Sequence, residues 1–223
     1  MSALSSADPE SPAAGPAVPF EQPVDRAAEL AGRPGVVRFL VVPAREFVLI
    51  DGDGPPGPEA FAPRMPGLYT TAWTLRFALK RRGVTTKVGL LEGFWWTLDG
   101  QTDLEAILAG DPGTWRWRLG IALPPEATDD ETAAALEAGR AKLAEPFAVS
   151  LRTTTVVEGR VAQLLHVGPY AEERASIARL HEAISAAGLV PTGWHHELYL
   201  GDPGRTAPER LKTLLRQPVR SHA

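Results

Sequence analysis

Two glutamates stand in the middle of short apolar segments, one in each half of the chain. Glu92 lies within LLEGFWW (90–96), and Glu197 lies within WHHELYL (194–200). A carboxylate among apolar side chains is unfavourable unless a partner or water reaches it. We therefore expect the two glutamates to meet in a shared cleft, and we place the function there.

These residue types suggest acid–base chemistry. Burial among aromatic rings raises the pKa of a carboxyl group, and a second carboxylate nearby raises one of the two further. Glu92 and Glu197 would then provide one protonated and one ionised acid near neutral pH, which general acid–base hydrolysis requires. The competing interpretation is that both are surface glutamates that pair with Arg116 or Arg152.

Alternation along the two strands identifies the neighbours of each glutamate. Successive side chains of a strand point to opposite faces. The residues that share a face with a glutamate are His195 and Tyr199 for Glu197, and Leu90, Phe94 and Trp96 for Glu92. Alternation alone assigns Trp95 and Trp194 to the core. Rings and carboxylates on one face would also hold a flat cation without any reaction.

The composition excludes several classes of function. The 223 residues carry a formal net charge of -4 and lack a Lys/Arg stripe, so we expect no nucleic-acid partner. The chain has no cysteine, which removes thiolate metal sites and cysteine nucleophiles and fits a cytoplasmic protein. His195 and His196 face opposite ways on a strand, and we expect no metal and no cofactor. No segment resembles a membrane span or a signal peptide.

The order of the patterns indicates a repeated architecture. Residues 1–33 are rich in proline and are predicted to form a flexible tail. Residues 34–223 are predicted to form a single domain of two modules, about 36–125 and 126–220. Each module runs strand, Gly-Pro turn, helix, Glu-bearing strand, strand, which predicts a duplicated βαββ fold of the α+β class. The antiparallel sheets would carry helices on one side, and the open face would hold a pocket along the pseudo-twofold axis.

Local patterns place the individual elements. Helices are expected over about 68–82, 102–108, 128–143 and 171–187, with a short one after Thr206. Strands are expected over about 36–42, 45–51, 87–98, 115–123, 147–157, 159–167, 194–200 and 214–219. The pair 147–157 and 159–167 is expected to form a hairpin.

Three motifs together resemble a known family. LLHVGPY (164–170), ELYLGDP (197–203) and LEGFWW (91–96) are similar to segments of the gyrase-inhibitor-like (GyrI-like) small-molecule-binding family. The resemblance covers about 36–220, and LEGFWW is similar to the stand-alone branch, which has no DNA-binding domain. It implies a duplicated βαββ fold with a cleft between the modules that accepts bulky aromatic or cationic compounds.

The resemblance also implies site residues. Some stand-alone members are similar to cyclopropanoid hydrolases, which open the strained ring of DNA-alkylating compounds with two pocket glutamates and Trp and Tyr support. Glu92 and Glu197 match the two glutamate positions and are the expected catalytic residues, together with Tyr69. The aromatic matches leave alternatives open: Tyr170 and Tyr199 are further candidates for the hydroxyl, and Trp95 or Trp96 is the counterpart of the tryptophan. The expected ligand-binding residues are Phe94, Trp95, Trp96, Tyr170, His195 and Tyr199. Phe94 stands where the family pattern leads us to expect leucine.

Two functions of other classes stay open. A non-catalytic protein that binds or sequesters drugs would use the same aromatic and acidic side chains. An interaction module that blocks a protein such as gyrase is the third alternative, although no residues single out a protein partner. The expected partner is a small aromatic or cationic ligand.

Overall fold

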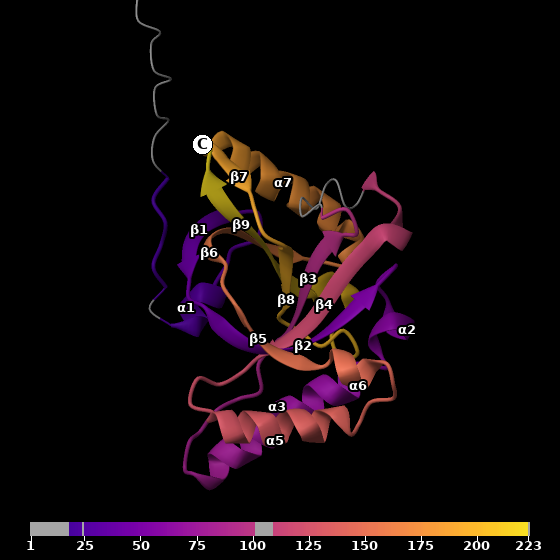
Figure 1. The fold of residues 1–223 in the computed structure, drawn as a ribbon. Helices are drawn as coiled ribbons and strands as arrows, with labels where there is room; N and C mark the ends of the chain where they lie inside the picture. The colour runs from indigo at the N-terminus through magenta and orange to yellow at the C-terminus, as the bar shows by residue number, and fades with distance from the viewer. Residues whose placement is uncertain (1–17, 24, 101–108, 223) are drawn as a thin grey trace, which may run out of the picture.

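The computed structural model describes residues 18–23, 25–100 and 109–222 of the chain (Figure 1). Its helices are α1 Arg26–Leu30, α2 Pro58–Phe61, α3 Met65–Arg81, α5 Asp129–Arg140, α6 Phe147–Ser150 and α7 Glu173–Ala186, with short 3-10 turns η1 Pro112–Thr114, η2 Tyr170–Glu172 and η3 Pro208–Arg210. Its strands are β1 Val37–Val42, β2 Arg45–Asp53, β3 Leu91–Thr97, β4 Trp115–Ala122, β5 Arg152–Val156, β6 Gly159–Val167, β7 Leu189–Pro191, β8 His195–Tyr199 and β9 Lys212–Ser221. The helix expected over 102–108 lies outside the described residues.

The predicted duplicated βαββ fold is confirmed. The first module is β2–α3–β3–β4, and the second is β6–α7–β8–β9. The strands follow one another in the order β1-β6-β9-β8-β3-β4-β2-β5, and all of the pairings are antiparallel. The modules meet where β3 pairs with β8.

The two ends of this sheet are joined by a second contact between the modules. β1 pairs with β6 from Val37↔Leu164 to Val42↔Gly159, and β2 pairs with β5 in the same register from Arg45↔Val156 onwards. The chain passes from β1 to β2, and from β5 to β6, through a bend of two residues, and the two bent segments pair with each other along their length. The strands form a closed circuit around a common interior, as Figure 1 shows.

This geometry corrects the predicted hairpin of 147–157 with 159–167. Residues Phe147–Ser150 form helix α6, and β5 pairs with β2 whereas β6 pairs with β1 and β9. The connection at 157–158 bends the chain without reversing it, so the two strands continue onto different partners. Loop length alone does not distinguish a bend from a hairpin turn.

The outer face of the sheet carries the large helices and the main core. In Figure 1, α3 and α5 lie together below the ring of strands and α7 lies above it. The α3 side packs against a cluster that includes Trp95, Trp117 and Ile121, and α7 packs Leu180 and its neighbours against Leu215. These helices share one side of the sheet, as predicted.

Residues 18–23 and 25–33 belong to the fold, although the sequence placed them in a tail. Helix α1 lies on the inner face, where the Gln163 amide donates a 2.8 Å hydrogen bond to the carbonyl oxygen of Glu29. Glu21 forms a bridge with Leu40, and the Glu29 side chain is 1% exposed. The partners that bury Glu29 are distant in sequence, so local composition does not reveal them. The rest of the predicted tail, residues 1–17, lies outside the described residues.

The close crossing of α3 and α5 generates a stability prediction. A methyl group on Gly139 would lie 2.1 Å from the Thr71 Oγ1 and 2.7 Å from the Gly67 carbonyl oxygen. Replacing glycine with alanine inside a helix ordinarily stabilises it by about 1 kcal/mol. We expect Gly139→Ala to destabilise the protein by about 1–3 kcal/mol in urea unfolding, because the helices must separate. A stabilised variant would contradict this packing.

Candidate functional site

The two predicted glutamates point to opposite faces of the sheet. In the β3–β8 pair, Glu197 lies across from Gly93, and Glu92 lies across from Leu198. Cross-strand partners share a face and neighbours along a strand do not, so Glu197 points outward and Glu92 points inward. The expectation that they share one cleft is corrected: the register is offset by one residue from the one that would bring them together.

The outward glutamate is the centre of a group of polar and aromatic side chains. We call this group the Glu197 cluster; its members are Trp95, Tyr170, Glu173, Glu197 and Tyr199. The Tyr199 hydroxyl donates a 2.8 Å hydrogen bond to the Glu197 Oε2. The Tyr170 ring meets the Tyr199 ring edge-on at 5.8 Å. Glu197 is 9% exposed and Tyr170 is 41% exposed, so the cluster reaches the surface at Tyr170.

Gly93 provides the space for this arrangement. A side chain there would begin 2.8 Å from the Tyr199 hydroxyl oxygen and 3.1 Å from the Trp95 Nε1. Both contacts are shorter than ordinary packing allows. The residue of the first module that lies directly opposite Glu197 of the second module is therefore a glycine, which has no side chain.

Two carboxyl groups in the cluster hold protons more tightly than usual. Burial raises the pKa of Glu197, although the hydrogen bond from the Tyr199 hydroxyl and the nearby His196 oppose the rise. Burial and the negative charge of Glu197 raise the pKa of Glu173 still further. The two groups interact, and a pair of this kind retains a proton near neutral pH while keeping one acid easier to ionise.

Sequence reasoning missed Glu173. It lies in the first turn of α7, where an acid ordinarily serves the helix terminus. Only the packing of α7 against the sheet buries Glu173, to 6% exposure, and brings it near Glu197. The available signal in the sequence was that Glu173 follows Tyr170, the last residue of the motif LLHVGPY, by three positions.

The other predicted residues of the outer face lie in or beside the cluster. His195 is fully buried, with its Nε2 3.8 Å from the Glu197 Oε1. Burial and the neighbouring His181 lower the pKa of His195 to about 3, so its imidazole is neutral. Tyr69, on α3, is 37% exposed, and burial together with the charge of Asp202 raises its pKa.

The inward glutamate belongs to a closed circuit of ion pairs. We call it the charge ring; in order its members are Glu29, Arg26, Glu92, His196, Glu158 and Arg216. Glu92 contacts the Arg26 Nη2 at 2.7 Å and the His196 Nε2 at 2.9 Å. Glu158 contacts the His196 Nδ1 at 2.9 Å and the Arg216 Nη1 at 3.0 Å.

Glu29 completes the charge ring. Its Oε1 lies 2.9 Å from the Arg216 Nη2 and also contacts Arg26, while its Oε2 pairs with Arg45. Burial would raise the pKa of Glu29, but the arginines outweigh burial and lower it. Each ring carboxylate therefore faces two cations of the ring, and Glu29 also faces Arg45 outside it.

The protonation state of the charge ring follows from its geometry. His196 has a carboxylate oxygen at 2.9 Å from each ring nitrogen: its Nδ1 is hydrogen-bonded to Glu158, and its Nε2 lies at ion-pair distance from Glu92. Two carboxylates at this distance stabilise the charged imidazolium form. Burial would lower the pKa of His196, but Glu158 and Glu92 raise it. Burial likewise opposes ionisation of Glu158, but His196 and Arg216 lower its pKa to about 2.

Two predicted ligand-binding residues also face inward. Phe94 is 1% exposed and stacks on His196 with ring centroids 4.1 Å apart. Trp96 stacks on Trp194 at 5.1 Å, and the Arg118 guanidinium lies over both indoles. The structure therefore places Trp95, Tyr170, His195 and Tyr199 with Glu197 on the outer side, and Phe94 and Trp96 on the same inner face as Glu92. Arg152, a proposed surface partner of the glutamates, pairs with Asp51.

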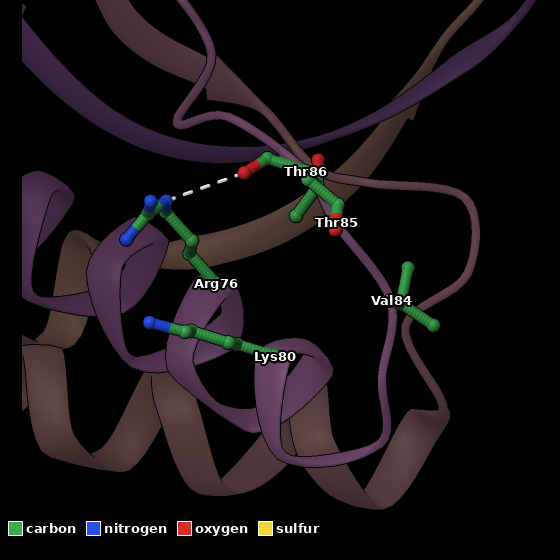
Figure 2. Close-up of a pocket in the computed structure, with 5 residues that line it drawn as sticks. All are labelled: Arg76, Lys80, Val84, Thr85 and Thr86. Carbon is green, nitrogen blue, oxygen red and sulfur yellow. Dashed lines mark hydrogen bonds between the residues drawn. The ribbon is translucent and has the colours of Figure 1, made fainter.

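A small hollow of about 90 Å³ lies away from both glutamates. Figure 2 shows its lining: Arg76 and Lys80 from α3, and Val84, Thr85 and Thr86 from the segment that follows. The Arg76 Nε donates a 3.2 Å hydrogen bond to the Thr86 carbonyl oxygen. None of the predicted site residues lines this hollow.

The described residues contain neither a group of metal ligands nor a helix that could cross a membrane. Within 18–23, 25–100 and 109–222, no three His, Cys, Asp or Glu side chains are grouped as metal ligands. In the same part of the chain, every helix is too short or too polar to cross a membrane.

Comparison with known proteins identifies relatives. The family model of the GyrI-like small molecule binding domain matches residues 119–220. The structure of an uncharacterized conserved protein from Listeria innocua is 30% identical and superposes with a TM-score of 0.73, over 87% of this chain and 97% of the other. The structure of a hydrolase from Listeria innocua is 29% identical, with a TM-score of 0.68 over 87% of this chain and 96% of the other.

A more distant structure shows the same fold. The EcmrR C-terminal domain is 11% identical, with a TM-score of 0.54 over 84% of this chain and 98% of the other. A search of curated proteins gave no match. The relative that is 30% identical over nearly its whole length, the matched family model and the duplicated βαββ fold agree, and the chain belongs to the GyrI-like small-molecule-binding family.

Proposed function

We propose that the protein binds bulky aromatic or cationic small molecules at the Glu197 cluster and hydrolyses an electrophilic cyclopropane ring of DNA-alkylating compounds. Such a reaction would protect the cell that makes or meets them. The observation that carries the proposal is the interacting pair Glu197 and Glu173, with the Tyr199 hydroxyl 2.8 Å from one carboxylate oxygen. The relative described as a hydrolase supports this reaction class.

Ligand binding would use the exposed edge of the cluster. Tyr170 and Tyr69 are both partly exposed, and both feel the charge of Asp202. Aromatic faces with carboxylates behind them attract flat cations through the ring quadrupole and through charge. The ligand would lie against the tyrosines with its reactive carbon directed toward Glu197.

The reaction requires one base and one acid. Ionised Glu197 would take a proton from water as the water oxygen attacks the cyclopropane carbon. The strained carbon–carbon bond breaks, and its electron pair moves into the conjugated dienone, whose oxygen becomes a phenolate. Protonated Glu173, or the hydroxyl of Tyr170, would give that oxygen a proton. The product is the substrate plus one water, and acid–base assistance of this kind contributes about 10²–10⁴ in rate.

Glu92 was predicted as the second acid, and its catalytic role stays a prediction. Its carboxylate points to the opposite face of the sheet from Glu197 and contacts Arg26 and His196. We assign the partner role to Glu173, because it lies on the same face as Glu197 and the two acids interact.

The first prediction separates catalysis from binding. Glu197→Gln and Glu173→Gln should each lower the rate of ring opening by about 10²–10⁴, because the amide neither takes nor gives the proton. Binding of an unreactive analogue should change by less than about tenfold. Ring opening of a spiro-cyclopropyl cyclohexadienone is measured as a water adduct by mass spectrometry. Wild-type rates in both variants would leave a non-catalytic binding protein.

The second prediction concerns Glu92. Glu92→Gln removes one charge from the buried ring, and breaking a buried ion pair costs roughly 3–5 kcal/mol. We expect a large loss of stability in urea unfolding, with the turnover of the remaining folded protein within about threefold of wild type. A variant that is as stable as wild type but inactive would show instead that Glu92 is a catalytic residue.

The third prediction is a pH dependence of binding. The pKa of each cluster carboxyl group is raised, so the pair gains negative charge only as the pH rises through and above neutrality. Affinity for an unreactive aromatic cation should therefore increase from about pH 6 to about pH 9. Glu173→Gln should remove the upper part of the rise, which ionisation of Glu173 contributes, and keep the lower part, which belongs to Glu197. A neutral ligand of the same shape serves as the control. Equal profiles for the cation and the neutral ligand would contradict a shared proton in the site.

A further inference from the structure

The inner face has a cavity that the proposed function does not use. It has a volume of about 360 Å³ and lies at the bend between β5 and β6, beside the turn that precedes β8. Its lining includes Phe94, Thr154, Glu158, Trp194 and Pro218. Pockets of roughly 300–1,000 Å³ accept a drug-sized molecule, and the interior of a ring of strands is a common place for one. The sheet separates this cavity from Glu197.

The aromatic walls of the cavity are held in place. Phe94 stacks on His196 on one side and meets Phe47 edge-on at 5.5 Å. Trp194 is stacked on Trp96, and the Arg118 guanidinium lies 4.7 Å from its ring centroid. A ligand would therefore find these ring surfaces already ordered, which lowers the entropic cost of binding.

The polar group of the cavity is the Glu158 carboxylate, which is able to accept further hydrogen bonds. The Glu158 side chain is 11% exposed, and each of its oxygens accepts one contact, from His196 or from Arg216. A carboxylate oxygen has two lone pairs, so each oxygen is able to accept a further hydrogen bond. The complementary ligand group is a donor, such as a phenol hydroxyl or an aromatic N–H.

The charge around Glu158 favours a neutral ligand. The carboxylates of the charge ring are matched by Arg26, His196 and Arg216, and Arg45 adds a further positive charge at Glu29. A cation entering the cavity would meet this compensated charge while losing its own hydration, which is unfavourable. A neutral donor keeps its hydrogen bond to an ionised acceptor without that loss.

We propose that this cavity is a second small-molecule site, which binds a neutral planar aromatic compound through contacts with Phe94 and Trp194 and a hydrogen bond to Glu158. The two faces of the sheet would then differ in ligand chemistry. The outer cluster, with its protonatable acids, suits cationic compounds, and the inner cavity suits neutral hydrogen-bond donors. The inference does not depend on whether the outer cluster hydrolyses its ligand.

The test uses 2-naphthol as the probe and isothermal titration calorimetry on the full chain. We expect 2-naphthol to bind, and 2-methoxynaphthalene to bind at least about tenfold more weakly, because it has no proton to donate to a charged acceptor. The 2-naphthylmethylammonium cation should compete poorly for the same site. A cation that displaces 2-naphthol with higher affinity would overturn the assignment of a neutral ligand.

Three variants locate the probe. Thr154→Phe should fill the cavity and weaken 2-naphthol binding at least tenfold. Ring opening should be unchanged, since Thr154 lines the inner cavity and the sheet separates it from Glu197 and Glu173. Trp194→Ala should weaken binding to a similar degree by removing one wall. Glu173→Gln, in the outer cluster, should leave 2-naphthol binding within about twofold.

The outcomes are distinguishable. Thermal unfolding establishes that Thr154→Phe is folded, and phenylalanine is favourable in a strand. Undiminished binding in a folded Thr154→Phe, or loss of binding in Glu173→Gln, would overturn the proposal, because the probe would then sit elsewhere. Failure of ring opening in wild type, with 2-naphthol binding as expected, would reject the proposed hydrolysis and leave this site standing.

Discussion

A closed circuit of ion pairs links the N-terminal helix to both modules of the fold. Moving an isolated charge from water into a protein interior costs several kcal/mol, and the cost is offset only when partners and hydrogen bonds surround the charge. In the charge ring each carboxylate faces two cations, and Gln163 accepts further hydrogen bonds from Arg216. Its members come from α1, β3, the β5–β6 bend, β8 and β9. Satisfying the ring therefore requires both modules and the N-terminal helix at once, which explains why α1 is part of the fold.

The same constraint divides the chemistry between the two faces of one short strand. His195 and His196 are adjacent and equally buried, yet the pKa of His195 is lowered to about 3 and that of His196 is raised. The difference lies in their partners: His196 has a carboxylate at each nitrogen, whereas His195 faces another histidine. Glu158 and Glu197 show the converse, since two cations lower the pKa of Glu158 and burial raises that of Glu197. The carboxyl groups with raised pKa values, Glu197 and Glu173, lie on the outer face, which is why the proposed proton transfer is assigned to that face.

Alternation and motif spacing predicted much of this correctly from the sequence. The residues expected beside each glutamate do lie on its face: His195 and Tyr199 with Glu197, and Phe94 and Trp96 with Glu92. The sequence did not predict the register between β3 and β8. Alternation determines which residues of one strand share a face, but it does not determine how two strands are aligned with each other. A shift of one residue reverses the relation between the two glutamates. The burial of Glu173 and the bend at 157–158 likewise depend on contacts between distant segments.

The offset also explains how a duplicated fold yields different polar groups on its two faces. Glu92 and Glu197 occupy similar positions in the two sequence patterns, but in space the partner of Glu197 is Gly93. One module supplies the acid, and the other supplies the space that admits the Tyr199 hydroxyl and the Trp95 indole beside it. In an exact repeat the residue opposite Glu197 would carry a side chain, which would leave no space for the Tyr199 hydroxyl and the Trp95 indole. Divergence at one cross-strand pair is thus sufficient to turn a symmetric scaffold into a site with a distinct acid, donor and opening.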